Sequence, residues 1–230
     1  MMKLAAIVPA AGRGTRIHSK IEKPYIKLCG KPILAHTLLR LADNKNISEI
    51  IVAVSRKNIY KTRRGIVERY NIKKVKVVAG GRERKDSVFN ALKNLSRGIN
   101  YVLIHDGIRP FITDSLIDSS VKAAQRFGAS VVAVPVKPTL KCVLRNGRIG
   151  HTPDRRNFLE AQTPQVFRRD LIERAYRKKQ NKKMHVTDDS MLVEKLGVRP
   201  KAILGSYDNI KITTQEDLVL AEILADKLKF

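Results

Sequence analysis

The residues best suited to chemistry lie in short loops that combine glycines with cations. The first of these loops is Pro9-Ala10-Ala11-Gly12-Arg13-Gly14-Thr15-Arg16. Its small residues let the backbone close on a ligand, and successive backbone N–H groups can form an anion-binding nest. Arg16 and Lys23 place two cations in the same stretch, which suits a triphosphate. The alternative is a tight strand–helix turn that binds no ligand.

Two familiar phosphate loops do not match this stretch. A P-loop has four residues between its glycines and then Lys followed by Ser or Thr, whereas one residue separates Gly12 from Gly14. A dinucleotide loop needs a third Gly or Ala where Ile17 stands, and an acidic residue near the end of the second strand. That strand ends in Val54-Ser55-Arg56, so an NAD-binding loop is disfavoured.

A second glycine loop, Gly80-Gly81-Arg82-Glu83-Arg84-Lys85-Asp86-Ser87, follows the third predicted strand. Its two glycines permit close approach of the backbone, and Ser87 can offer its hydroxyl to a ligand from the start of a helix. An ordinary helix N-terminus accounts for the same residues, with Asp86 or Ser87 accepting from free N–H groups. This loop alone favours the ordinary N-terminus.

A third loop, His105-Asp106-Gly107-Ile108-Arg109-Pro110, follows the fourth predicted strand. An Asp at the carboxyl end of a central strand can hold a polar substrate or a metal, while an Arg three residues later can bind phosphate. The alternative is a buried Asp106–Arg109 pair that only fixes the loop. Because strand ends of this kind face the ligand crevice of α/β sheets, the functional interpretation is favoured.

Later polar motifs are less specific. They are Asp154-Arg155, Thr163-Pro164-Gln165, Thr187-Asp188-Asp189 and the run from Asp208 to Thr213. The second predicts a turn, and the third predicts a helix capped by Thr187. With 46 Lys and Arg residues, residue type alone cannot select Lys23, Arg155 or Lys211 as catalytic. The five histidines lack metal-ligand spacing and no Gly-x-Ser-x-Gly element occurs, which excludes zinc and serine hydrolases.

Apolar runs alternate with amphipathic segments along all 230 residues and predict one α/β domain. Strands are predicted at residues 4–9, 49–54, 75–79, 101–105, 130–136 and 200–204. Helices are predicted at residues 33–41, 58–70, 86–95, 115–127, 169–179, 188–196 and 215–229. The strands carry no polar alternation, so both faces of a doubly wound, parallel sheet are buried. Ligands of such sheets bind beyond the carboxyl ends of the strands, where the three loops lie.

Residues 137–154 interrupt this alternation. The segment is basic, contains Pro138 and Pro153, and carries Asn146-Gly147 between short apolar flanks. Asn-Gly in this context predicts a β-hairpin closed by a type I′ turn. We therefore expect a two-stranded arm that projects from the sheet. An isolated hairpin is marginally stable in water, so the arm is expected to pack on another surface, such as a second subunit.

The formal charge of +25 is concentrated in residues 10–31, 55–85 and 137–183. Such a field favours polyanions, among them nucleic acid, anionic membranes and phosphorylated small molecules, although a solvated basic surface explains it equally well. No apolar run has the length of a membrane span, and the apolar N-terminal stretch ends in Pro9 without a signal-peptide cleavage site. Cys29 and Cys142 show no disulfide or metal pattern, so a cytoplasmic location is expected.

Taken together, eight motifs occur in the order seen in one family. They are Val8-Pro9-Ala10-Ala11-Gly12-x-Gly14-x-Arg16, Lys23-Pro24-Tyr25, Gly30-Lys31-Pro32-Ile33-Leu34, Gly80-Gly81-x-x-Arg84-x-x-Ser87-Val88, His105-Asp106-x-x-Arg109-Pro110, Thr163-Pro164-Gln165-x-Phe167, Thr187-Asp188-Asp189 and Asp208-Asn209-Ile210-Lys211-Ile212-Thr213. Through them the whole chain resembles the 2-C-methyl-D-erythritol 4-phosphate cytidylyltransferases (IspD family) of the non-mevalonate isoprenoid pathway. The resemblance implies a Rossmann-like nucleotidyltransferase domain over residues 1–230. It also implies condensation of CTP with methylerythritol phosphate, release of pyrophosphate, and Mg²⁺ held mainly by the CTP phosphates.

The resemblance further implies roles for individual residues. Arg16 and Lys23 would stabilise the transition state at the α-phosphate, whereas Arg155 and Lys211 would position the acceptor phosphate. The residues implied to hold the nucleotide are Pro9, Ala10, Ala11, Gly12, Gly14, Gly81, Arg82 and Ser87. The residues implied to contact the sugar phosphate or the ribose are Asp106, Arg109, Thr139 and Thr163. The family's arm exchanges between two subunits, which implies a homodimer with Thr139 and Arg155 in the partner's site.

Two departures and two rival functions bear on this resemblance. Lys23 is followed by Pro24 where many relatives have Gln, and Arg82 cannot contact a base through an acidic side chain. Ribitol 5-phosphate cytidylyltransferases share several motifs but usually open with Ala-Gly-Gly, whereas this chain has Ala10-Ala11-Gly12. A nucleic-acid-binding protein would suit the charge. However, aromatic residues amount to 5% with no Trp, and no aromatic-and-basic RNA motif occurs, so nucleic acid is not expected as a partner.

Overall fold

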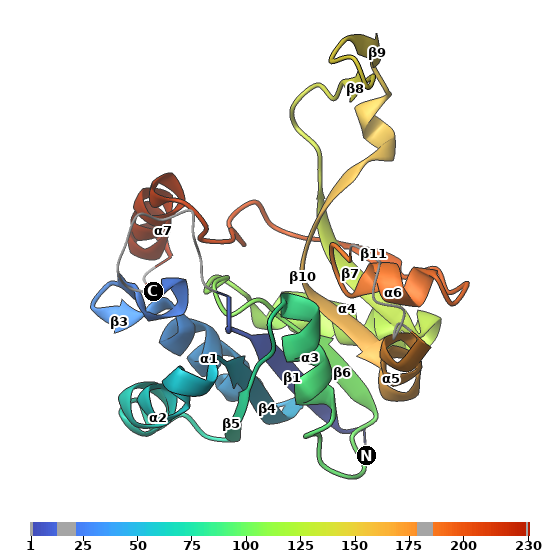
Figure 1. Cartoon of the computed structure of the whole chain (residues 1–230). Helices are drawn as coiled ribbons and strands as arrows, with labels where there is room; N and C mark the ends of the chain where they lie inside the picture. Colours follow the sequence, from blue (N-terminus) through green and yellow to red (C-terminus); the bar gives the residue numbers. More distant parts are fainter. Residues whose placement is uncertain (1, 13–21, 179–185, 229) are drawn as a thin grey trace.

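The computed structural model describes residues 2–12, 22–178, 186–228 and 230, and its main feature is a seven-stranded sheet (Figure 1). In the order β11-β7-β10-β6-β1-β4-β5, the strands are Lys201–Leu204, Ala129–Pro135, Leu159–Arg168, Tyr101–Ile104, Leu4–Pro9, Ile47–Val54 and Val75–Ala79. β10 runs antiparallel to its neighbours β6 and β7, and the other adjacent pairs are parallel. The predicted doubly wound, mostly parallel α/β class is confirmed.

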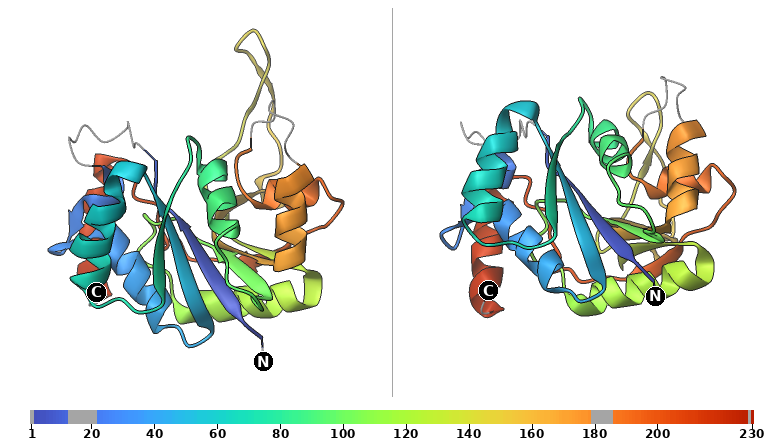
Figure 2. Two further views of the ribbon diagram at one scale, coloured as in Figure 1. Left: turned by 60° about the horizontal axis from the view of Figure 1, so that its bottom comes forward. Right: turned by 90° about the horizontal axis from the view of Figure 1, so that it is seen from below.

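Helices cover both faces of the sheet (Figure 2). They are α1 (Ile33–Asp43), α2 (Ile59–Thr62), α3 (Arg84–Leu92), α4 (Asp114–Phe127), α5 (Arg169–Lys178), α6 (Ser190–Glu194) and α7 (Gln215–Lys227). Side chains of α1 and α4 share a core cluster with one face, and those of α3, α5 and α6 share a cluster with the other. α7 packs instead on a third, smaller cluster beside the short hairpin of β2 (Lys27–Leu28) and β3 (Lys31–Pro32).

The central strand β1 shows why the strand sequences lack polar alternation. Leu4, Ala6 and Val8 point into one core cluster, while Ala5 and Ile7 point into the other. All five side chains are fully buried. A strand that is covered on both faces needs apolar residues at every position, and this buried centre places the loops after β1, β5 and β6 at one edge.

The predicted parallel order missed one strand, β10. Thr163-Pro164-Gln165 was predicted to form a turn, but it lies inside β10, with a cis peptide bond between Thr163 and Pro164. Gln162, Thr163 and Gln165 are buried there as polar residues. Their side chains hydrogen-bond to neighbouring segments, so burial does not require an apolar sequence at these positions.

Helix boundaries differ from the predictions where side chains cap the helices. α3 begins two residues early because Glu83 and Asp86 form a capping box, in which the Asp86 carboxylate accepts from the N–H of Glu83 at 3.0 Å. The prediction that Thr187 caps the next-to-last helix is wrong. α6 begins after Asp189, and the carboxylate of Asp188 accepts from the N–H of Met191 at 3.1 Å. The predicted helix 58–70 is irregular, because a π-helical turn, Arg63–Glu68, follows α2.

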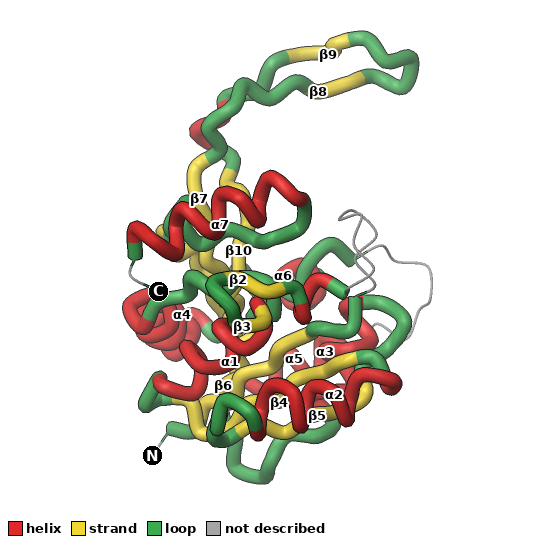
Figure 3. Tube along the Cα trace, turned by 90° about the vertical axis from the view of Figure 1, so that its left-hand side faces the viewer, coloured by secondary structure: helices red, strands yellow, loops and turns green. Residues whose placement is uncertain are grey.

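The predicted arm is present and projects far from the sheet (Figures 1 and 3). β7 and β10 lead into it, and β8 (Cys142–Val143) pairs with β9 (Ile149–His151) at its tip. The predicted type I′ turn is wrong. Gly147 has a φ of 80°, but Asn146 is not among the residues with positive φ, which a type I′ turn requires at both centres. The N–H of Gly147 donates instead to the carbonyl of Leu144 at 3.0 Å.

Within the described residues, no helix has both the length and the apolar character needed to cross a lipid bilayer.

Candidate active site

A cavity of about 310 Å³ opens at the carboxyl edge of the sheet. It is lined by Pro9, Ala10, Ala11, Gly12, Lys23, Pro24, Gly81, Arg82, Glu83, Arg84, Ser87, Asp106, Ile108, Lys211 and Thr213. These residues come from the end of β1 and the loop after it, from the loop after β5 and the first turn of α3, from the loop after β6, from a 3₁₀ turn at Lys23–Tyr25 and from the segment before α7. We name this space the loop cavity. Most of the predicted nucleotide residues, together with Lys23, Asp106 and Lys211, line it.

Two predicted residues, Gly14 and Arg16, lie outside the described residues, which resume at Glu22.

The Gly80-Gly81 pair lets two loops pass close to one another. A Cβ atom added to Gly81 would lie 2.2 Å from the Cβ of Asp86, and one added to Gly80 would lie 2.6 Å from the Cβ of Ala11. The N–H of Gly81 donates to the Ser87 hydroxyl at 3.0 Å, and that hydroxyl donates to the carbonyl of Glu83 at 3.2 Å. Ser87 therefore shapes the wall of the loop cavity as well as lining it.

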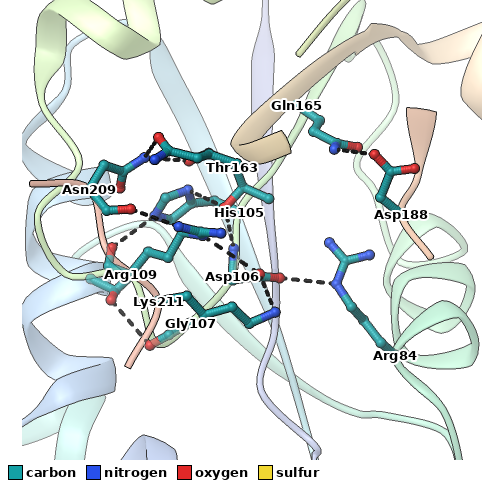
Figure 4. A network of polar contacts seen from close by, with 12 residues as sticks. Arg84, His105, Asp106, Gly107, Arg109, Thr163, Gln165, Asp188, Asn209 and Lys211 are labelled. Atoms are coloured by element: carbon teal, nitrogen blue, oxygen red, sulfur yellow. Dashed lines mark hydrogen bonds and ion pairs between the residues drawn. The ribbon is translucent and has the colours of Figure 1, made fainter. Parts of the chain in front are cut away.

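Asp106 is the carboxylate around which the cations of the site gather (Figure 4). Its Oδ1 accepts from Arg84 Nε at 3.0 Å, and its Oδ2 lies 2.8 Å from Lys211 Nζ. Arg109 Nε lies 3.9 Å from Oδ2. Burial alone would raise the pKa of Asp106, but the three cations outweigh burial and hold that pKa well below its usual range. Asp106 is therefore ionised, and each of its two oxygens is paired with a cation.

A buried chain of hydrogen bonds fixes the loop behind Asp106 (Figure 4). His105 Nε2 lies 3.0 Å from the carbonyl of Arg109, which can only accept, so Nε2 carries the proton. His105 Nδ1 is then the acceptor for the Thr163 hydroxyl at 3.0 Å, and that hydroxyl in turn accepts from the N–H of Asp106 at 3.1 Å. Burial lowers the pKa of His105 to about 4. Thr163 thus positions Asp106 from β10 and does not line the loop cavity.

A second cavity, of about 420 Å³, lies on the other side of Lys211. It is lined by Arg109, Val134, Glu160, Gln162, Tyr207, Ile210, Lys211, Thr213 and Asp217. We name it the arm-base cavity, because Val134 and Glu160 belong to the strands that lead into the arm. Lys211 and Thr213 line both cavities. The predicted phosphate ligand Arg109 therefore faces the arm-base cavity and not the loop cavity.

Asn209 holds the Lys211 segment in place. Its side-chain amide donates to Gln162 Oε1 at 3.0 Å and to the carbonyl of Thr163 at 2.9 Å. Its own carbonyl accepts from Arg109 Nη1 at 2.7 Å. Lys23 Nζ donates to the carbonyl of Thr213, so the 3₁₀ turn is joined to the same segment. The sequence singles out Asn209 only as a member of the motif that runs from Asp208 to Thr213.

Arg84 was not among the predicted site residues. It lines the loop cavity and bridges two carboxylates. Its Nε donates to Asp106 at 3.0 Å, and its Nη1 donates to Asp189 at 2.7 Å. Asp189 also accepts from the Tyr176 hydroxyl at 2.5 Å. These partners lie far apart along the chain, so the spacing of residues carries no signal for this arrangement.

Two predicted residues, Thr139 and Arg155, lie on the arm and line neither cavity. Both are exposed, and Arg155 Nη1 donates to the carbonyl of Lys137 across the base of the arm. One chain therefore does not place them in either of the cavities that Lys211 lines.

The described side chains of the site provide few ligands for a metal ion. The described residues contain no group of three or more His, Cys, Asp or Glu side chains that could hold one. Both oxygens of Asp106 already meet cations. A divalent ion would fit only if a bound polyanion supplied most of its ligands, as triphosphates do for Mg²⁺.

Backbone amides and cations around a cavity at the carboxyl edge of a doubly wound sheet define an α/β enzyme that handles phosphorylated nucleotides, a nucleotidyltransferase. A family model described as IspD, 2-C-methyl-D-erythritol 4-phosphate cytidylyltransferase, matches residues 4–227. The chain belongs to this family.

Relatives support the match over the full length. The 2-C-methyl-D-erythritol 4-phosphate cytidylyltransferase of Alkaliphilus oremlandii (strain OhILAs) is 46% identical over 221 residues, which cover 96% of this chain and 94% of that protein. Its counterpart in Syntrophus aciditrophicus (strain SB) is 44% identical over 98% of this chain and 97% of that protein. The crystal structure of 4-diphosphocytidyl-2C-methyl-D-erythritol synthase from Anaerococcus prevotii DSM 20548 has a TM-score of 0.88 and 34% identity, covering 98% and 96% of the two chains.

Proposed function

We propose that this chain condenses CTP with 2-C-methyl-D-erythritol 4-phosphate, giving 4-diphosphocytidyl-2-C-methyl-D-erythritol and pyrophosphate. The observation that carries the proposal is the pair of cavities that share Lys211 and Thr213. A nucleotide in the loop cavity and a phosphorylated acceptor in the arm-base cavity would meet at a common cation. The names of the relatives supply the identities of the two substrates.

In this proposal the nucleotide lies against the loop after β1. Ala10, Ala11 and Gly12 would offer backbone amides to the triphosphate, and the Gly81–Ser87 wall would contact the base. Lys23, with Arg16 from the same stretch of sequence, would neutralise the charge that develops on the α-phosphate. The buried position of Lys23 in the wall of the loop cavity supports its part of this role.

The acceptor phosphate would lie between Lys211 and Arg109. Arg109 is a buried guanidinium that lines the arm-base cavity, and its Nε has no hydrogen-bond partner among the described residues. Arg155 and Thr139 would complete this subsite from the arm of a second subunit, since they line neither the loop cavity nor the arm-base cavity of their own chain. The proposed enzyme is therefore a homodimer with shared sites.

The chemistry needs no strong base. The nucleophile is a phosphate oxygen that is ionised at neutral pH, so the enzyme has to align two polyanions and neutralise charge at the transition state. Arg, Lys and backbone amides do this without a catalytic His or Cys. Asp106 would keep Lys211 directed toward the boundary of the two cavities, because their 2.8 Å ion pair fixes the ammonium group.

We include Mg²⁺ as the cofactor of the proposed reaction. The phosphates of CTP would hold it, and Asp106 is engaged by Arg84 and Lys211, so this chain would add few ligands. The ion would supply charge neutralisation to the triphosphate. We also propose a cytoplasmic location, in keeping with the two free cysteines, Cys29 and Cys142.

The direct test is pyrophosphate release from CTP and Mg²⁺ with each of two acceptors, methylerythritol 4-phosphate and ribitol 5-phosphate. The proposal predicts release with methylerythritol phosphate alone. Release only with ribitol phosphate would keep the reaction type and refute the acceptor. A folded protein that binds CTP and releases pyrophosphate with neither acceptor would refute the proposed activity.

A further inference from the structure

The arm-base cavity carries charges of both signs. Arg109 and Lys211 are its cations, and Glu160 and Asp217 are its carboxylates. Arg109 is buried, whereas Glu160 is exposed. A site for a phosphate group alone has no use for carboxylates, because they repel the anion. The two carboxylates of this cavity therefore need a separate explanation.

The carboxylate of Asp217 is explained by the fold. Its Oδ2 accepts from the N–H of Thr213, from the hydroxyl of Thr213 and from the N–H of Thr214, each at 2.8 Å. The last of these bonds belongs to the capping box at the start of α7. Asp217 therefore serves the N-terminus of a helix.

Neutral polar side chains of the cavity are also held by the protein. Gln162 donates through Nε2 to the carbonyl of Ser206 at 2.9 Å, and its Oε1 accepts from Asn209 at 3.0 Å. The hydroxyl of Tyr207 donates to the carbonyl of Pro135 at 2.7 Å. Each of these groups already has a partner in the chain before a ligand binds.

Glu160 differs from these groups, because its side chain forms no hydrogen bond or salt bridge with any described residue. It lies in β10 opposite Val134 of β7, and both residues line the cavity. Its charge nevertheless reaches Arg109: burial lowers the pKa of Arg109, and the carboxylates of Asp106 and Glu160 oppose that shift. An ionised carboxylate only accepts hydrogen bonds. Glu160 therefore suits the hydroxyl groups of a ligand whose phosphate meets Arg109 and Lys211.

We propose that Glu160 selects the acceptor, because its carboxylate binds the hydroxyl groups of a phosphorylated polyol and repels an anion that lacks them. The phosphate of the polyol would lie between Arg109 and Lys211, and its hydroxyl groups would donate to Glu160. A phosphate ester without hydroxyl groups would meet the same cations and only the repulsion of the carboxylate. This selection rests on the proposed function and adds the residue that recognises the polyol part of the acceptor.

Glu160→Gln tests the selection, because it keeps the size of the side chain and removes its charge. The KM for methylerythritol 4-phosphate at saturating CTP should rise about tenfold, since hydrogen bonds to a charged group are lost. Methyl phosphate, whose carbon carries no hydroxyl group, should inhibit more strongly, with an inhibition constant about threefold lower, since a repulsion is removed. The KM for CTP should stay unchanged. Pyrophosphate release at pH 8, where both esters are dianions, measures all three constants.

Glu222→Gln is the matched control, since Glu222 is an exposed glutamate of α7 that lines neither cavity. It removes the same charge and should leave all three constants unchanged. An unchanged KM for methylerythritol 4-phosphate in Glu160→Gln would overturn the selection and leave the proposed reaction standing. Shifts in the same direction for both esters would overturn it too, because they would show that Glu160 acts only through the cations.

The remaining outcomes separate the selection from the proposed function. If the wild type uses ribitol 5-phosphate and not methylerythritol 4-phosphate, the proposed acceptor is wrong, and the same opposite shifts with ribitol 5-phosphate would uphold the role of Glu160. A wild type that releases pyrophosphate with neither polyol would refute both. A Glu160→Gln protein that no longer sediments as the wild-type dimer would show that Glu160 acts through contact between subunits, which would overturn the selection.

Discussion

At the scale of single residues, the ionised carboxylate of Asp106 orders the cations of the site. Arg84 and Lys211 occupy its two oxygens, and each cation lines the loop cavity. The sequence predicted the site around Asp106 because an acidic residue ends a central strand. It placed Arg84 in the second glycine motif but could not predict its partners, because Asp189 is brought in by packing of a segment that lies 105 residues further along the chain.

Buried His105 should make the stability of the protein depend on pH, because the folded state holds this side chain in its neutral form. The pKa of His105 is about 4 in the folded protein and about 6.5 in an unfolded chain. The unfolded state therefore takes up the proton first as the pH falls. The stability contributed by neutral His105 is complete above about pH 6.5 and is lost toward pH 4, which amounts to about 3 kcal/mol.

The His105→Gln variant should lack that part of the pH dependence. Urea unfolding at pH 7 and pH 4.5 would measure it, and the free energy of unfolding of the wild type should fall more steeply than that of the variant. His151→Gln, at an exposed position on the arm, serves as the control and should behave like the wild type. Equal slopes for the wild type and His105→Gln would contradict the assigned neutral form.

At the scale of elements, apolar runs predicted the strands whose two faces are covered, such as β1. They did not predict β10, because Gln162, Thr163 and Gln165 are buried through hydrogen bonds and not through apolar character. The polar middle of β10 holds Asp106 and Asn209 in place. The apolar pattern therefore failed to predict β10, the strand whose polar residues hold the site in place.

The glycine loop after β5 has no room for a side chain at Gly81. In Gly81→Ala the new Cβ would lie 2.2 Å from the Cβ of Asp86, so the loop or the first turn of α3 has to move. We expect a loss of about 2 kcal/mol of stability and weaker CTP binding. Calorimetric titration with CTP and urea unfolding would measure the two effects.

Gly65→Ala is the matched control, because a Cβ atom added at Gly65 would meet no atom within 4 Å beyond its chain neighbours and its own helix backbone, and Gly65 does not have a left-handed φ. This variant should bind CTP like the wild type. Unchanged CTP affinity in Gly81→Ala would show that the loop does not form the nucleotide wall.

At the scale of the whole molecule, the arm keeps Arg155 and Thr139 out of both cavities that Lys211 of the same chain lines. A shared site predicts complementation between Lys211→Ala and Arg155→Ala, since each homodimer lacks one cation in both sites. The mixed dimer keeps one intact site. After equal mixing and subunit exchange, pyrophosphate release should recover to about a quarter of the wild-type rate.

The control for this experiment pairs Lys211→Ala with Asp106→Asn. Both residues belong to the same chain's part of the site, so their mixed dimer has no intact site and should stay inactive. If Lys211→Ala and Arg155→Ala also fail to complement while dimers form, each site would lie within one chain and the shared-site model would be wrong.

Lys211 stands between the nucleotide and the acceptor phosphate in the proposed site. The most direct measurement compares wild type and Lys211→Ala for pyrophosphate release from CTP and methylerythritol 4-phosphate, together with equilibrium binding of CTP. We expect Lys211→Ala to lose about a thousandfold in turnover while its affinity for CTP stays nearly unchanged. Equal losses of turnover and of CTP affinity, or no loss of turnover, would contradict it.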